Sequence, residues 1–229
     1  MRTIHVEIGE RQLQDGLTLL AVQNPGVETF AASVALDVDV RDEAEGEEGL
    51  ANLLGDCLDE GTKKRTAVQL AEAIDGLGGT LGGGAAGGSV QCPATESRKA
   101  LRLLGEMVRE PAFPARGTRR VQQEVLNEIR AEMDDPQTVA SRRFRKEVYG
   151  KHPFGRSVRG SLESVAKFSC QALRRFHGRW FRPEGGYVAA AGPEEPERTL
   201  DMLAATFRGL DGGTVKHVRP EPPSMPKDV

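Results

Sequence analysis

The sequence is poor in cysteine and in aromatic residues, and it has little net charge. Its 229 residues include three cysteines, one tryptophan and two tyrosines, and the formal charge is −3. Three scattered cysteines without a Cys-x-x-Cys pair do not form a disulfide framework and are typical of a reducing compartment. The balanced charge and the scarcity of stacking rings argue against nucleic acid or an acidic membrane surface as a partner.

Long apolar runs are also missing. No stretch approaches the roughly 18 consecutive apolar residues of a membrane span, and the first residues show no apolar segment of a secretory leader. We therefore expect a cytoplasmic protein with no membrane partner. Hydrophobic residues make up 38% of the chain and charged residues 28%, as in ordinary globular proteins. A chain of this length can bury one large core.

Alternating and helical hydrophobic patterns indicate an α+β fold. Residues 11–14 and 17–23 flank an Asp-Gly pair that is typical of a hairpin turn, and residues 30–40 and 187–191 also have strand patterns. Ser161 and Ser169 are suited to cap the helices that follow them. We expect a mixed or antiparallel sheet with helices packed on one face. The predicted helices cover residues 48–60, 66–77, 96–109, 117–133, 136–149, 170–181 and 195–208.

The domain organisation follows from the distribution of proline. Residues 1–215 contain all the predicted elements and are expected to form a single domain. Residues 216–229 contain four prolines, which favours an extended tail or an interdomain linker.

A run of glycine and alanine at residues 82–88 has two interpretations. One is a strand that passes close to a neighbouring backbone or helix, where small residues make room. The other is a phosphate-binding loop, but no Gly-Lys-Ser/Thr sequence follows and no helix begins at the glycines. The sequence favours the strand.

Short motifs spread along nearly the whole chain carry a family resemblance. They include Gly-Leu-Thr at 16–18, Glu-Gly-Leu-Ala at 48–51, Gly-Thr at 61–62, Leu-Gly-Gly-Thr-Leu at 77–81, Glu-Ile-Arg at 128–130, Asp-Pro at 135–136, His-Pro-Phe-Gly-Arg at 152–156 and Phe-His-Gly-Arg-Trp-Phe-Arg-Pro at 176–183. In this order they resemble the N-terminal half of the insulinase, pitrilysin and mitochondrial processing peptidase family of zinc peptidases. The resemblance implies a processing-peptidase-like metallohydrolase domain.

The resemblance also implies where the chemistry lies in active relatives. Two histidines four positions apart on a helix bind zinc there, the glutamate before the second histidine is the general base, and a glutamate from a later helix is the third ligand. Here Asn52 occupies the first histidine position, Gly55 the base position, Asp56 the second histidine position and Glu128 the third-ligand position. Glycine cannot accept a proton, and an asparagine amide is a poor zinc donor. The resemblance therefore implies no catalytic residue and no bound zinc or other cofactor.

Two other interpretations of these residues remain open. Asp56, Glu128 and the Asn52 carbonyl could form an oxygen site for magnesium or calcium. Alternatively, Asn52 and Asp56 form a solvated polar face of the helix, opposite its apolar stripe, and Gly55 lies on the same face. Glu128 would then be an exposed residue of a long helix.

Other nucleophile and histidine sites are not indicated. Cys57 lies on the apolar stripe of its predicted helix, which does not favour a reactive thiol. His152 is expected in a turn and His177 beside Trp180. His5 and His217 lie near the two ends of the chain, and no two histidines share a helical spacing.

The expected function is that of a non-catalytic family member. Such a subunit would pair, as a homo- or heterodimer, with a related chain that carries an intact His-x-x-Glu-His motif. Together they would enclose a peptide substrate, which an edge strand could hold by backbone pairing. An active metallopeptidase with a rearranged metal site and a purely structural scaffold subunit are the alternatives.

Overall fold

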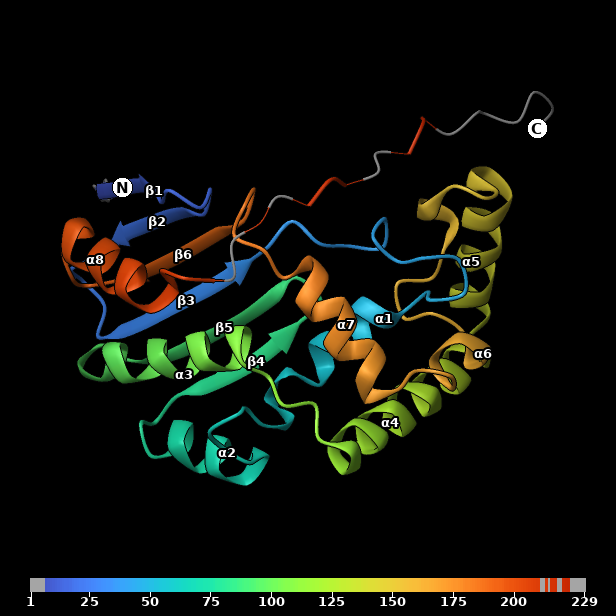
Figure 1. Cartoon of the computed structure of the whole chain (residues 1–229), viewed down its shortest axis with the longest axis horizontal. Coiled ribbons are helices and arrows are strands. Elements are labelled where there is room, and N and C mark those ends of the chain that lie inside the picture. The colour runs from blue at the N-terminus through green and yellow to red at the C-terminus, as the bar shows by residue number, and fades with distance from the viewer. Residues whose placement is uncertain (1–6, 211–212, 214, 218–219, 223–229) are drawn as a thin grey trace.

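A mixed six-stranded sheet organises the chain (Figure 1). The computed structural model describes residues 7–210, 213, 215–217 and 220–222. The strand order is β1-β2-β6-β3-β5-β4. Strands β2 and β6 are parallel, and the other neighbours are antiparallel. The strands are β1 (Glu7–Gln12), β2 (Thr18–Gln23), β3 (Thr29–Ala35), β4 (Thr80–Gly84), β5 (Gly87–Pro93) and β6 (Tyr187–Gly192).

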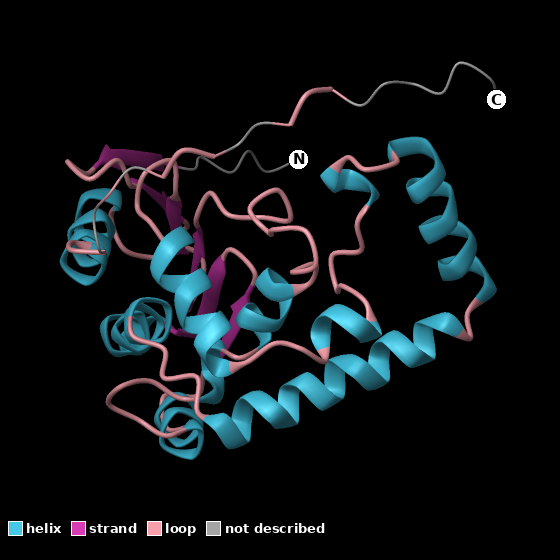
Figure 2. Cartoon of the chain, turned by 45° about the vertical axis from the view of Figure 1, so that its right-hand side comes forward, coloured by secondary structure: helices cyan, strands magenta, loops and turns pink. Residues whose placement is uncertain are grey.

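Helices cover one face of this sheet, which confirms the expected α+β class. Helices α3 and α8 pack on the strands, while α4 leads away from the sheet towards α5 (Figures 1 and 2). The buried side chains of β3 and β6 alternate with exposed ones, as a sheet with one covered face requires. The helices are α1 (Leu50–Asp56), α2 (Ala67–Asp75), α3 (Ser97–Arg109), α4 (Ala115–Met133), α5 (Pro136–Tyr149), α6 (Leu162–Val165), α7 (Cys170–Trp180) and α8 (Pro196–Phe207).

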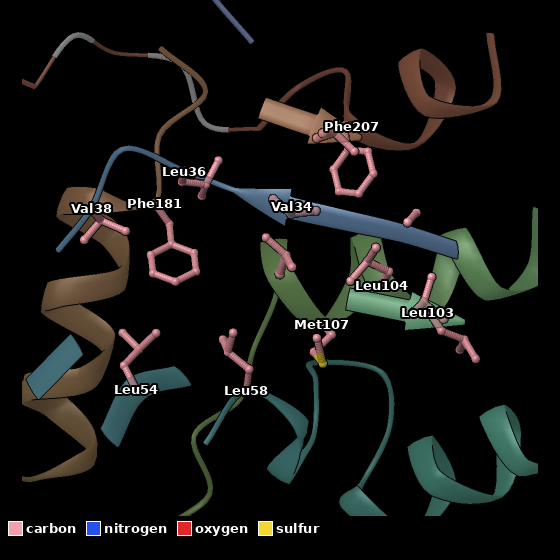
Figure 3. Close-up of a cluster of buried hydrophobic side chains, with 14 of the residues drawn as sticks. Val34, Leu36, Val38, Leu54, Leu58, Leu103, Leu104, Met107, Phe181 and Phe207 are labelled. Atoms are coloured by element: carbon pink, nitrogen blue, oxygen red, sulfur yellow. The ribbon is translucent and has the colours of Figure 1, made fainter. Parts of the chain in front are cut away.

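The core lies between the sheet and its helices. Val34 of β3 faces Leu104 and Met107 of α3 and Phe207 of α8, and these four side chains are at most 4% exposed (Figure 3). Leu54 of α1 extends the same cluster towards the other end of the sheet. Burying a side chain of this size contributes about 1.5–3 kcal/mol relative to leaving it exposed. The position of α1 is therefore fixed by the main core.

Local turn and capping chemistry agrees with the sequence. Gly16 has a φ of 88° at the turn between β1 and β2, a conformation that glycine adopts without steric cost. The Ser161 side chain accepts from the Ser164 backbone N–H at 3.0 Å, and Ser169 accepts from the Ala172 N–H at 3.2 Å. These contacts confirm the predicted starts of α6 and α7.

Several predicted elements differ from the structure. The first strand of the hairpin, expected over residues 11–14, is β1, Glu7–Gln12. The helix expected over residues 48–60 ends at Asp56 and is followed by a 3₁₀ turn, Leu58–Glu60. The Cys57 N–H contacts the carbonyls of both Leu53 and Leu54, which shows the tightening that precedes such a turn. Strand β3 ends at Ala35, not at residue 40, because its partner β5 begins opposite it. The glycine-rich run forms a hairpin of two strands, β4 and β5, where one strand was expected.

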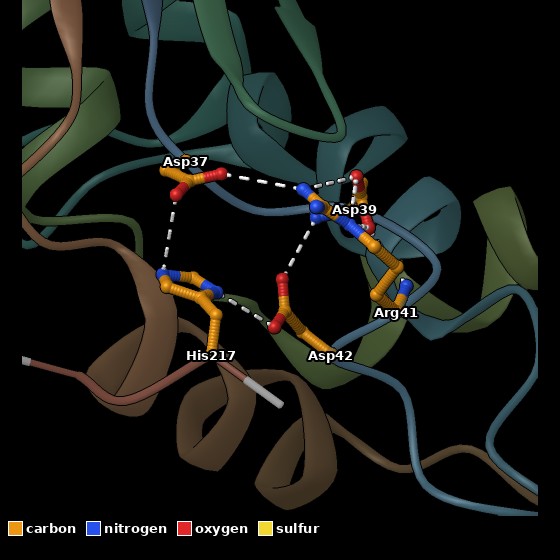
Figure 4. A network of polar contacts seen from close by, with 5 residues as sticks. All are labelled: Asp37, Asp39, Arg41, Asp42 and His217. Atoms are coloured by element: carbon orange, nitrogen blue, oxygen red, sulfur yellow. Dashed lines mark hydrogen bonds and ion pairs between the residues drawn. The ribbon is translucent and has the colours of Figure 1, made fainter. Parts of the chain in front are cut away.

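The segment after α8 returns to the end of β3. His217 Nδ1 lies 2.9 Å from Asp42 Oδ1, and its ring stacks on Trp180 with centroids 5.4 Å apart. Arg41 joins the neighbouring Asp37 and Asp39 in the same network (Figure 4). Most of the predicted tail, residues 216–229, lies outside the described residues, as does His5. Within the described chain, every helix is too short or too polar to cross a bilayer.

Candidate functional site

Asn52 and Asp56 lie one turn apart on α1. The Asn52 Nδ2 donates a hydrogen bond to Asp56 Oδ2 at 2.8 Å. Leu53 and Leu54 point into the core from the other side of the helix. Asn52 and Asp56 therefore share a face of α1, as their i, i+4 spacing predicts.

Glu128 extends from α4 and forms an ion pair with an arginine. The Arg159 Nη1 donates to Glu128 Oε2 at 2.7 Å and lies 3.1 Å from Glu132 Oε1. Arg159 comes from the loop before α6, which brings a fixed positive charge to the third-ligand position. The sequence analysis missed Arg159, because a single loop arginine 31 positions from its partner leaves no local pattern.

Electrostatic coupling connects these groups. Partial burial raises the pKa of Asp56, and the negative charge of Glu128 raises it further, while Arg159 opposes the shift. Asp56, Glu128 and Arg159 therefore act as one electrostatic cluster, although their side chains come from α1, α4 and a loop.

This coupling predicts how the pKa of Asp56 responds to substitution. Glu128→Gln should lower that pKa because it removes a repulsive charge, whereas Arg159→Met should raise it because it removes an attractive one. Carbon-detected NMR titration of the Asp56 carboxyl measures both shifts. Glu124→Gln, one turn earlier on α4 and paired with Arg120, is the control and should leave it unchanged. Equal Asp56 pKa values in all variants would contradict the coupling.

Gly55 faces the β4–β5 hairpin and is buried. A Cβ atom built on Gly55 would lie 2.5 Å from Ala85 N and 2.8 Å from Gly84 Cα, closer than real Cβ atoms approach such atoms. From the other side, a Cβ on Gly83 would lie 2.8 Å from Leu58 Cβ. The predicted close approach of the glycine-rich segment to a helix is confirmed, whereas the expected position of Gly55 on the solvated face is wrong.

The N-terminal end of α1 is capped by a residue that sequence analysis did not single out. The Glu43 carboxylate accepts from the Ala51 N–H at 2.9 Å and from the Gly49 N–H at 3.1 Å. Glu43 is 4% exposed, and this burial raises its pKa from 4.5 to about 7.

The side chains at the four positions that the resemblance assigns to the zinc site do not fit a zinc ion. None of the four positions offers an imidazole, Asp56 accepts from Asn52, and Glu128 is paired with Arg159. Over the described part of the chain, no three His, Cys, Asp or Glu side chains come together in a way that could hold a metal. A guanidinium at this place also argues against the oxygen site for magnesium or calcium, because it supplies the positive charge that a cation would bring.

The remaining candidate groups have structural surroundings. Cys57 is fully buried, and burial raises the pKa of its thiol to about 12, which excludes a reactive thiolate near neutral pH. His177 Nε2 lies 2.8 Å from the Val108 carbonyl oxygen. His152 Nδ1 accepts from the Phe154 N–H at 3.2 Å, which confirms its expected place in a turn.

Sequence comparison matches most of the chain to one family. The profile described as Insulinase (Peptidase family M16) matches residues 19–161. An uncharacterized zinc protease of Rickettsia bellii is 27% identical over 213 residues, which cover 91% of this chain and 52% of the relative. The chain thus spans about half the length of the curated relatives it matches.

Solved structures share the fold. The peptidase M16 inactive domain from Pseudomonas fluorescens superposes with a TM-score of 0.85 and 23% identity, covering 95% of this chain and 54% of that one. Pitrilysin superposes with a TM-score of 0.84 and 19% identity, covering 96% of this chain and 24% of that one.

Proposed function

The chain belongs to the insulinase family, peptidase family M16, and from this premise we propose that it is a non-catalytic member that helps bind or enclose a peptide substrate with an active partner. The observation that carries the proposal is Gly55. It stands where the family resemblance places the general base, it has no side chain, and the hairpin backbone fills the space that a side chain would need. The loss of a general base alone costs about 10²–10⁴-fold in rate.

The surroundings of the site support a role in peptide binding. Strand β4 lies at an end of the sheet order and packs against α1. An extended peptide could add to such an edge through backbone hydrogen bonds, which need no catalytic group. The fold of the inactive domain from Pseudomonas fluorescens is an example of this architecture without activity.

The chain spans about half the length of the curated relatives it matches. In the proposed complex, a related chain with an intact His-x-x-Glu-His motif supplies the active site. Cys57, Cys92 and Cys170 are unpaired, which supports a reducing compartment such as the cytoplasm.

Metal content and peptide cleavage test the proposal directly. The chain is purified alone and after co-expression with a motif-bearing family member. Alone, it should contain no stoichiometric zinc by mass spectrometry of the metal and should not cleave a fluorogenic peptide library. With the partner, cleavage should exceed that of the partner alone.

The controls separate the alternatives. A partner whose motif glutamate is replaced by glutamine should abolish cleavage by the complex. Zinc and turnover in the isolated chain would overturn the proposal and favour a rearranged metal site. A stable complex that leaves the partner's cleavage unchanged would also overturn it, in favour of a scaffold.

A further inference from the structure

A groove with a basic rim lies between α2, α3 and α8, at the opposite end of the molecule from α5 (Figure 1). Its volume is 610 Å³. Glu106 is the one acidic residue among those that line it. The lining cations are Lys64, Arg65, Arg98, Lys99, Arg102 and Arg109.

Three of these six cations form ion pairs with glutamates of the protein. Arg65 pairs with Glu106, so the carboxylate in the groove is already engaged. Lys64 Nζ lies 3.2 Å from Glu110 Oε2, and Lys99 Nζ lies 2.7 Å from a carboxylate oxygen of Glu96. Arg98, Arg102 and Arg109 take part in none of these ion pairs.

The charge of the three arginines is not compensated. Arg98 and Arg102 are exposed and make no ion pair or side-chain hydrogen bond within the part of the chain that the structure describes. Arg109 donates from Nη1 to the Thr206 carbonyl at 3.0 Å, while its buried Nε has no acceptor among the described residues. The groove therefore has a surplus of positive charge and of hydrogen-bond donors.

The arginines follow one stripe of α3. Arg98, Arg102 and Arg109 stand at i, i+4 and i+11, so they share a helix face over about 16 Å of axis. Like charges at i and i+4 of a helix repel each other and weaken it. Arg98 and Arg102 are about 6 Å apart along the helix, close to the distance between alternate residues of an extended chain, about 6.6 Å.

The groove also has an apolar floor, and this floor distinguishes among the classes of anionic ligand that the basic rim could bind. The apolar lining residues with appreciable accessible surface are Ala73 and Leu77, which are half-buried, and Ala205 of α8, which is exposed. A small inorganic polyanion would leave this floor unused. Single-stranded nucleic acid is bound on stacking rings, and none of the lining residues is aromatic. A peptide with alternating acidic and apolar side chains would use both the rim and the floor.

We propose that the groove between α2, α3 and α8 binds an extended acidic peptide segment whose carboxylates contact Arg98 and Arg102 and whose apolar side chains cover the floor. This binding site is separate from the degenerate metal site and needs no partner subunit. Failure of the non-catalytic proposal therefore leaves this one standing, and the reverse is also true.

Fluorescence anisotropy with labelled synthetic peptides tests the proposal on the full chain. The probes are Glu-Leu-Glu-Leu-Glu, its lysine analogue Lys-Leu-Lys-Leu-Lys and the polar analogue Glu-Ser-Glu-Ser-Glu. The first should bind saturably and weaken at high salt. The lysine analogue should not bind, and the serine analogue should bind several-fold more weakly because it leaves the floor uncovered.

Two double variants identify the surface. R98A/R102A should weaken binding of the Glu-Leu peptide about tenfold, since each exposed ion pair is worth up to about 1 kcal/mol. R116A/R119A removes two other exposed arginines, on α4, and should change the dissociation constant less than about twofold. All four substitutions are at exposed positions, and circular dichroism checks that both variants fold.

Equal binding by both variants would overturn the assignment of the groove. Tighter binding of tripolyphosphate or of an oligothymidine, lost in R98A/R102A, would overturn the peptide in favour of phosphate chemistry. Absence of saturable binding by the Glu-Leu peptide would overturn the proposal as a whole.

Discussion

Gly55→Ala is expected to lower the free energy of unfolding by about 1–3 kcal/mol, and Gly55→Glu by more. Alanine in a helix interior normally gains about 1 kcal/mol over glycine. At this position the gain is outweighed, because the new Cβ would lie 2.5 Å from Ala85 N. The obstructing atoms belong to the backbone of a packed hairpin, so α1 and β4 must separate. A chain of this size should lose roughly 2–4 °C of melting temperature per kcal/mol.

Gly82→Ala is the matched control. Gly82 lies in the same hairpin, and a Cβ built on it meets no atom within 4 Å. Its melting temperature, measured by calorimetry with that of Gly55→Ala, should stay within about 1–2 °C of wild type, since surface substitutions change stability by less than about 0.5 kcal/mol. Wild-type stability of Gly55→Ala would contradict the packing argument.

The same contact predicts the result of rebuilding the zinc motif. The triple variant N52H/G55E/D56H carries the complete His-x-x-Glu-His pattern, yet we expect it to be destabilised and to lack stoichiometric zinc. The glutamate side chain would displace the hairpin, and Arg159 would still pair with Glu128. Metal analysis of the purified variant, and of the same variant with Arg159→Ala, measures the two obstacles separately.

Stability is expected to fall as the pH rises from about 5 to about 8, through Glu43. Its pKa is raised from 4.5 to about 7 in the folded protein. Between these values the native state keeps a proton that the unfolded state has released, so a higher pH favours unfolding. The raised pKa corresponds to a loss on the order of 3 kcal/mol across this window.

Glu43→Gln should remove the contribution of Glu43 to the pH dependence of stability. Its amide oxygen can still accept from the Ala51 N–H, and the side chain no longer titrates. Urea unfolding at about pH 5 and about pH 8 gives the difference in free energy between wild type and variant at each pH, and this difference should change by roughly 3 kcal/mol. Glu45→Gln, an exposed residue of the same loop, should show no such change. A parallel pH dependence in wild type and Glu43→Gln would refute the raised pKa.

Local chemistry made much of the fold predictable. The Asp-Gly turn, the serine caps at residues 161 and 169 and the helical spacing of the apolar residues each act over a few positions, and the structure confirms them. The spacing of Asn52 and Asp56 likewise sufficed to place them on one face of α1.

The tertiary contacts of the site left no such local pattern. Gly55 looked like part of a polar face, because Asn52 and Asp56 are polar and were expected on that side of the helix. Only the β4–β5 hairpin, some thirty positions away, shows why Gly55 has no side chain. Arg159 contacts two glutamates of α4, and Glu43 accepts from two backbone N–H groups at the start of α1, and neither set of contacts follows a regular sequence spacing. Sheet order had the same limitation, because hydrophobic alternation defines which face of a strand is buried but not its neighbours.

The position of β6 determines when this protein can complete its sheet during synthesis on the ribosome. Residues 187–192 form the strand between β2 and β3, with a parallel partner on one side and an antiparallel one on the other. Until they emerge, the nascent chain has two separate sheet fragments whose facing edges carry unpaired backbone groups. Such edges attract other chains, so translation from β3 to β6 is the period in which this protein is most exposed to misassociation.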